Sequence, residues 1–119
     1  MKLHGAESKT SLVAAVNYAS SLVVLKRFEE AKALLRKTLP VARRVLAEGD
    51  ETTLRMRWSY ATALSEDPAA TPENLLEAVK TLEDTERTAR RVLGGAHPLV
   101  VGIEKSMRNS RAALGARKT

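Results

Sequence analysis

Two stretches decide the fold: FEEAKALLRKTLPVARRVL at residues 28–46 and LLEAVKTLEDTERTARRVL at residues 75–93. At a displacement of 47 positions they share Glu, Ala, Leu and Thr at matching places, and both close on ARRVL. Upstream, NYA at 17–19 matches SYA at 59–61 at a displacement of 42. The five-residue difference corresponds to DPAAT at 67–71, which is typical of a turn. The chain therefore predicts a duplicated unit of about 42 residues, with one loop enlarged in the second copy.

The composition favours helices and a single domain over residues 1–119. Ala, Leu, Arg, Lys and Glu abound, and these residues lose little freedom in a helix. Hydrophobic residues make up 44% and charged residues 29% of the chain, which is typical of a folded domain rather than a disordered one. Cysteine is absent, which excludes disulfides, thiolate metal sites and cysteine nucleophiles.

Hydrophobic spacing and terminus signals predict two helices in each unit and one further helix. Asp50 and Thr71 are expected to be N-caps. Pro72 and Pro98 stand in first helical turns, where a missing N–H costs nothing, and Gly94 ends the fourth helix. The expected helices cover residues 8–25, 27–47, 51–65, 72–93 and 98–116.

Small and apolar residues at 3,4 spacing predict one buried stripe on the second helix and an equivalent stripe on the fourth. The motif ARRVL ends each stripe. Its Ala and Val should face inward, while its arginines should lie near the negative end of the helix dipole. Pro40 should bend or locally break the second helix near Leu39. The two stripes are Ala31, Leu35, Thr38, Ala42 and Val45, and Leu75, Ala78, Leu82, Thr85, Ala89 and Val92.

Two antiparallel helices per unit, with NYA…L on the first and EA…L on the second, resemble a tetratricopeptide repeat, although that repeat usually has about 34 residues. The connector LGGAHP at 93–98 is similar to the connector of kinesin light chain-type repeats. The corresponding LAEGDETTL at 46–54 departs from it, with Gly-Asp-Glu where His-Pro would fall. The overall sequence pattern is similar to that of kinesin light chain-like repeat proteins of unicellular algae, and the resemblance covers about residues 10–117.

The resemblance implies an all-α fold in which antiparallel helix pairs stack as a short right-handed α-solenoid. Repeat one would cover about residues 10–48 and repeat two about 51–94, and a C-terminal capping helix would cover about 98–116. The first helix of each pair would line a concave groove that binds extended peptides. In kinesin light chains such peptides are acidic around a tryptophan. Two repeats make a short groove, so affinity for one peptide should be modest.

On this basis the groove should display polar, basic and aromatic side chains, and an acidic peptide or protein is the expected partner. Asn17 falls at the asparagine-rich position of the family, whereas Ser59 replaces it in the second repeat. Trp58 is open to two interpretations, core packing or anchor of a bound peptide. The expected binding residues are Asn17, Ser20, Arg55, Trp58, Thr62, Lys105 and Asn109.

The first helix is apolar nearly all round, which usually means burial on every side. Besides a stripe of Leu12, Ala15, Ala19 and Leu22, four valines are expected to lie off that stripe. We therefore expect a homodimer or larger assembly through Val13, Val16, Val23 and Val24. The cores of the two first helices are expected to use Tyr18, Ala19 and Leu22, and Tyr60, Ala61 and Leu64.

Catalysis, metals and cofactors are not expected. The two histidines, His4 and His97, are far apart in the sequence, and the glycine pair at 94–95 lacks the spacing of a phosphate loop. The acidic run at 83–86 is interpreted as an exposed face. The predicted function is a non-catalytic protein–protein interaction scaffold that binds a peptide or protein partner through the concave groove, through the apolar first helix, or through both. The first alternative is a structural subunit of a homo-oligomer or larger complex.

A basic nucleic-acid-binding protein is the remaining alternative. The net charge of +6 favours acidic partners, but the basic residues are spread along the helices rather than gathered in one run. No apolar run is long enough to span a membrane, and the first residues do not resemble a secretory signal. A cytoplasmic location is therefore expected.

Overall fold

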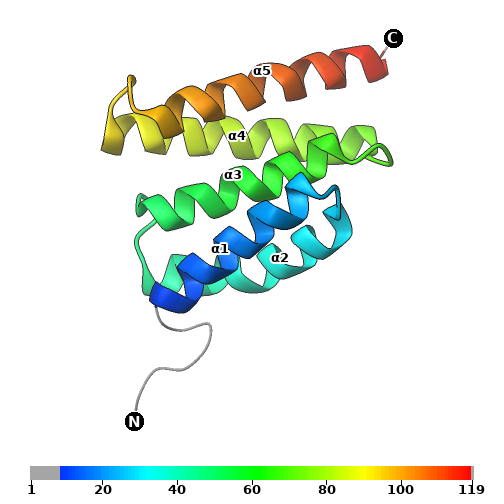
Figure 1. The fold of residues 1–119 in the computed structure, drawn as a ribbon. Helices are drawn as coiled ribbons and strands as arrows, with labels where there is room; N and C mark the ends of the chain where they lie inside the picture. The colour runs from blue at the N-terminus through cyan, green and yellow to red at the C-terminus, as the bar shows by residue number, and fades with distance from the viewer. Residues whose placement is uncertain (1–8, 119) are drawn as a thin grey trace.

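The computed structural model describes residues 9–118, and these residues form five α-helices joined by short connectors. Consecutive helices run antiparallel, and the stack rises from the α1/α2 pair to α5 (Figure 1). Ser8 and His4 lie outside the described residues. The expected bounds agree with the observed ones to within two residues at every terminus that can be compared. The helices are α1 (Lys9–Val24), α2 (Phe28–Val45), α3 (Glu51–Glu66), α4 (Pro72–Leu93) and α5 (Pro98–Lys118).

Each helix packs against the next one in the chain, and α3 also packs against both α1 and α5. Helices α1, α3 and α5 therefore form one row, and α2 and α4 pack against its other side. The molecule measures 55 × 31 × 20 Å along its principal axes, so it is elongated. The first, third and fifth helices consequently share one continuous surface.

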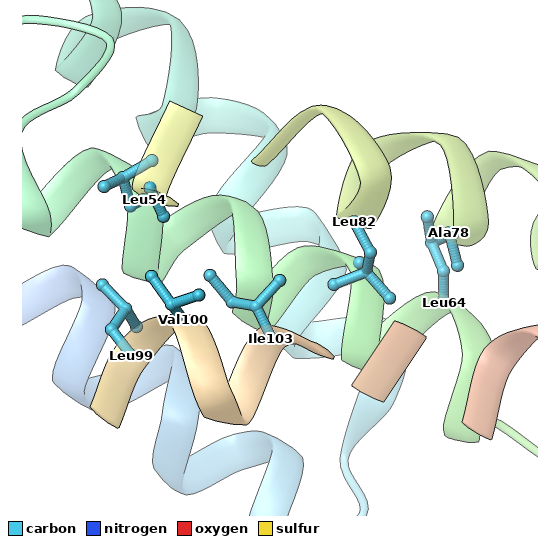
Figure 2. Close-up of a cluster of buried hydrophobic side chains, with 9 residues drawn as sticks. Leu54, Leu64, Ala78, Leu82, Leu99, Val100 and Ile103 are labelled. Carbon is cyan, nitrogen blue, oxygen red and sulfur yellow. The ribbon is translucent and has the colours of Figure 1, made fainter. Parts of the chain in front are cut away.

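The core is built on both sides of α3. On one side, α3 joins α4 and α5 in a cluster whose side chains converge between the three helices (Figure 2). On the other side, Met56 of α3 joins residues of α1 and α2, including Leu12, Val16 and Leu35. The cluster of Figure 2 includes Leu54, Leu64, Ala78, Leu82, Leu99, Val100 and Ile103.

The expected terminus signals act at the predicted residues. The Asp50 side chain accepts the Thr52 backbone N–H at 2.8 Å and caps α3. Thr71 and Asn74 exchange side-chain and backbone bonds at the start of α4, as a capping box does. Gly94 ends α4 with φ of 90°, a conformation that favours glycine.

The start of α5 has a cap that the sequence reasoning missed. The His97 Nδ1 atom accepts the backbone N–H of Leu99 at 3.0 Å. An imidazole nitrogen thus satisfies one of the N–H groups that a helix start leaves without an intrahelical partner. The His-Pro pair of the connector therefore has a local structural role.

Helix α2 runs without interruption from Phe28 to Val45 through Pro40, so the helix does not break there, and the alternative of a bend near Leu39 stays a prediction. Pro40 is exposed. The carbonyl that loses its N–H partner lies on Arg36, which is also exposed, so water can bond to it. An exposed position explains why the helix tolerates proline here.

Two groups of predicted core residues are wrong. Val45 and Val92 of the ARRVL motifs are 41% and 51% exposed, although the other stripe positions are buried. A Cβ at Gly49 would lie only 2.9 Å from Cγ2 of Val92, so Val92 covers a connector instead of entering the core. Tyr18 is also exposed, at 57%, because no helix precedes α1 among the described residues to cover it.

Candidate functional site

The row of α1, α3 and α5 carries two adjoining hollows. The first, of about 300 Å³, extends from Ser20 and Val23 of α1 across α3 to Ser106 of α5. The second, of about 260 Å³, continues between the C-terminal part of α3 and α5. Thr62, Glu66 and Ser106 line both, so the two hollows form one groove, called here the α1–α3–α5 groove.

Trp58 lines the first hollow of this groove and also contacts the core. It is half-buried, and its ring packs against the hydrophobic cluster shared by α3, α4 and α5. The indole N–H donates to the Ser106 hydroxyl at 2.8 Å. A Cβ on Gly102 would come within 2.5 Å of the ring, so α5 approaches it closely at that glycine. Core packing of Trp58 is therefore confirmed, and the residue also lines the groove, while its role as anchor of a bound peptide stays a prediction.

Arg55 is a partly buried cation in the first hollow. Its guanidinium donates to the Asn17 side-chain oxygen at 3.4 Å, and no carboxylate among the described residues forms an ion pair with it. Many other basic residues do have acidic partners, including Arg27 with Glu30 and Arg111 with Glu83. The charge of Arg55 therefore stays available to an acidic group in the groove.

The other predicted binding residues fall in different places. Ser20 lines the first hollow and its hydroxyl lies 3.3 Å from that of Ser59, while Thr62 lines both hollows. Asn109 lines the second hollow. Lys105 is exposed and lines neither hollow. The structure thus gathers Ser20, Arg55, Trp58, Thr62 and Asn109 along one groove. Asn17 lines neither hollow but bonds to Arg55, and Lys105 lies outside the groove.

Sequence reasoning missed several residues that line the groove. On α3, positions 55, 58, 59, 62 and 66 follow helical 3,4 spacing, so extending the pattern from Arg55 would have reached Glu66. On α5, the choice of Lys105 was one position away from Ser106, whose register only the packing against α3 decides. The missed residues are Val23, Val24, Ser59, Ser65, Glu66, Ser106, Ser110 and Ala113.

The four valines expected at an interface are not equivalent. Val16 is fully buried between α1, α2 and α3, so its placement off the buried stripe is wrong. Val13 and Val23 are partly buried, and Val23 packs beside Phe28 and Leu22. Val24 is 79% exposed, and the neighbouring Leu25 is 63% exposed. Of the four valines, Val24 alone is exposed, and with Leu25 it forms an exposed apolar patch at the end of α1.

Buried charges of the second helix pair have intramolecular partners. Arg57 is 4% exposed and bonds to Asp84 of α4 and, at 3.3 Å, to Glu48. The hydrogen bond from Arg57 lowers the pKa of Asp84 below its ordinary value, and the charge of Arg87 acts in the same direction. These groups form a structural ion-pair network away from the groove.

Lys32 is a second buried cation, at the end of α2 that lies near the connector after α3. Burial by itself lowers the pKa of Lys32, but hydrogen bonds and charges from Glu29 and Asp67 outweigh it, so the pKa is raised. The Lys32 Nζ atom lies 2.9 Å from Glu29 and 3.4 Å from Asp67. This charge is also satisfied within the chain.

Within residues 9–118, no group of three or more His, Asp or Glu side chains is placed to hold a metal ion. None of the described helices is both long and apolar enough to cross a membrane. No protein-family model matches the sequence, and comparisons with characterised proteins and with solved structures give no match either.

Proposed function

We propose that the protein is a non-catalytic scaffold for protein–protein contact, which binds an extended acidic peptide segment of a partner protein in the α1–α3–α5 groove. The observation that carries the proposal is that one hollow is lined both by the Trp58 ring and by Arg55, a cation that forms no ion pair with the described residues. In this proposal the five helices are two tetratricopeptide-like repeats and a capping helix, stacked as a short right-handed solenoid similar to kinesin light chain repeats.

The groove chemistry supports a peptide as the ligand. Arg55 can pair with a carboxylate, and the Trp58 ring and Val23 offer an apolar surface to a neighbouring side chain. The hydroxyls of Ser20, Ser59 and Thr62 can bond to peptide backbone groups. A hollow of about 300 Å³ accommodates a few side chains, so micromolar or weaker affinity is expected.

Selection from a displayed library of random dodecapeptides tests the proposal. Enriched peptides should carry an acidic residue beside an apolar one, and their binding should change the fluorescence of Trp58, which is the single tryptophan. Binding should fall about tenfold in Arg55→Glu, because an attractive charge becomes a repulsive one. The matched control is Arg91→Glu on α4, outside the groove, which should bind as the wild type does.

The proposal is wrong if the selected peptides bind Arg55→Glu and wild type equally, or if no peptide is enriched over the unselected library. A strong salt-dependent affinity for DNA or RNA, with no peptide binding, would favour the basic nucleic-acid-binding alternative.

A structural role in a homo-oligomer is the second candidate, and the exposed apolar patch at the end of α1 favours it. Val24 and Leu25 are adjacent, are 79% and 63% exposed, and line the same surface hollow. Light scattering over a dilution series should then give a dimer or larger species for the wild type and a monomer for Val24→Glu. A wild type that stays monomeric at every concentration would exclude this role.

A further inference from the structure

The second hollow differs chemically from the first. It lies between the C-terminal end of α3 and the middle of α5, and its lining carries hydroxyl, amide and carboxylate groups but no basic side chain. Glu66 lines both hollows, but the first hollow also contains the cation Arg55, so only the second has an acidic side chain without a basic one. The hollow of about 260 Å³, called here the α3–α5 recess, is lined mainly by Thr62, Ser65, Glu66, Ser106, Asn109 and Ser110.

Ser110 is the first indication that the α3–α5 recess binds a ligand. The residue is only 1% exposed, yet its Oγ atom has no hydrogen-bond partner among the described residues. Buried hydroxyls usually have a partner, because burial removes the water that would otherwise bond to them. Ser110 lines the recess, so a donor placed there could bond to the Oγ atom.

Glu66 gives the α3–α5 recess a negative charge. It is exposed, and no basic side chain among residues 9–117 lies within ion-pairing distance of it. Glu66 is also the last residue of α3, whose final turn contains no basic residue. The negative end of the α3 dipole therefore adds to the carboxylate charge instead of being neutralised.

We propose that the α3–α5 recess binds the protonated amine of a lysine side chain on the bound peptide, an inference that rests on the function proposed above. An ammonium group has three donors and no acceptor. The Glu66 carboxylate and the hydroxyls of Ser65 and Ser110 supply acceptors for such donors. A compact ammonium group suits an arrangement of separate acceptors better than a planar guanidinium, which favours bidentate pairing with one carboxylate.

The two charged sites then fix the charge order of the peptide. Arg55 and Glu66 are 11 positions apart on α3, which corresponds to about 16 Å along the helix. An extended peptide advances about 3.3 Å per residue, so the acidic residue and the lysine should be roughly five positions apart. Apolar residues between them would pass Trp58.

Amide chemical shifts of the ¹⁵N-labelled protein, titrated with N-acetyl-lysine-methylamide, test the α3–α5 recess directly. Saturable shifts are expected at the amides of Ser65, Glu66 and Ser110. The ε-acetylated form of the same compound, which has no positive charge, should cause none of them. Affinity should fall about two- to fivefold in Glu66→Gln, the range expected for an exposed charge pair. The control variant Glu73→Gln removes an exposed carboxylate on α4 and should leave the affinity unchanged.

Three results would overturn the inference: equal shifts with the charged and acetylated compounds, equal affinity in Glu66→Gln and wild type, or no saturable shift at the recess amides. Tighter binding of N-acetyl-arginine-methylamide than of the lysine compound would overturn the choice of ammonium. Arg117 follows Ala113 by one turn on the same face of α5. If its side chain filled the recess in solution, the wild type would show no shift.

The amine titration separates this inference from the proposed function. Selected peptides that bind through Arg55, without a recess that accepts amines, would leave the peptide scaffold standing and overturn the recess. An amine-binding recess without any groove-binding peptide would overturn the scaffold instead. If both hold, replacing the lysine of a selected peptide by norleucine should weaken binding to the wild type but not to Glu66→Gln.

Discussion

The first helix pair, α1 and α2, and the second, α3 and α4, have identical residues at equivalent buried positions. Thr38 and Thr85 occupy equivalent positions, both are buried, and each hydroxyl donates to the carbonyl four residues earlier, at 2.9 and 2.6 Å. Leu35 and Leu82 are both fully buried. The identical residues therefore mark the positions at which the helices of each pair pack against each other.

The two pairs differ at positions whose burial depends on a neighbouring helix. Tyr60 is half-buried because Arg36 of α2 lies over its ring, at 5.9 Å from the centroid, and donates to its hydroxyl at 3.4 Å. Tyr18, at the equivalent position, is 57% exposed. The difference teaches that a repeated residue acquires a repeated environment only when the helix that covers it is also repeated.

The pairs also differ in how α3 and α1 contact their partner helices. Arg57 of α3 is buried and bonds to Asp84 of α4. The equivalent positions of the first pair hold Ala15 and Lys37, which cannot form this bond. The second pair therefore depends on a charge contact that the first pair does without.

Core truncation should have the largest effect and should test whether the two interiors are equivalent. Leu35→Ala and Leu82→Ala each remove a fully buried side chain, so each should lower the free energy of unfolding by about 2–5 kcal/mol. Urea unfolding followed by far-ultraviolet circular dichroism measures both. If one variant loses less than about 0.5 kcal/mol, the two stripes are not equivalent in the folded protein.

Loss of Asp84 should have the next largest effect, and only in the second pair. Asp84→Asn leaves the buried Arg57 with the more distant Glu48, so the free energy of unfolding should fall by about 1–2 kcal/mol. The matched variant Lys37→Ala, at the equivalent position of α2, should change it by less than about 0.5 kcal/mol. Equal losses in the same urea experiment would contradict the claimed asymmetry.

Lowering the pH should weaken the ion pair between Arg57 and Asp84 and so lower the free energy of unfolding. The pKa of Asp84 is lowered in the folded protein, so its contribution is fully present above the unfolded value of 3.8 and is lost as pH falls through the folded pKa. Between roughly pH 5 and pH 2 the wild type should therefore lose more stability than Asp84→Asn. Thermal unfolding of both proteins across this range measures the difference. Parallel pH profiles would show that the pKa of Asp84 is not lowered by folding.

The two tyrosines should give the smallest effect and the finest comparison. Tyr60→Phe removes the hydroxyl that accepts from Arg36 and donates to Glu77, so it should cost about 0.5 kcal/mol. Tyr18→Phe should be neutral, because no hydrogen bond to the Tyr18 hydroxyl is formed by the described residues. A cost for Tyr18→Phe similar to that for Tyr60→Phe would indicate that something covers Tyr18 in solution.

The sequence pattern predicted the helices well because their terminus signals are local. Asp50, Thr71 and Gly94 act on backbone groups within a few residues, so no tertiary information is needed. The positions of Val16 and Val92 were wrong because burial at a helix surface depends on which neighbour reaches it. Part of the groove, including Arg55, Trp58 and Thr62 of α3, was predicted for the same local reason, namely helical spacing. Ser106 and Ser110 were missed because the rotation of α5 about its axis is decided by packing alone.

The position of α3 between two cores has a consequence for how the chain folds. Leu54 and Leu64 face one cluster and Met56 faces another, so neither helix pair buries its apolar surface without this helix. The two helix pairs should therefore not behave as separate folding units. Protection of backbone amides from hydrogen exchange should be highest in α3 and should decline toward α1 and α5, with one cooperative transition for the whole chain.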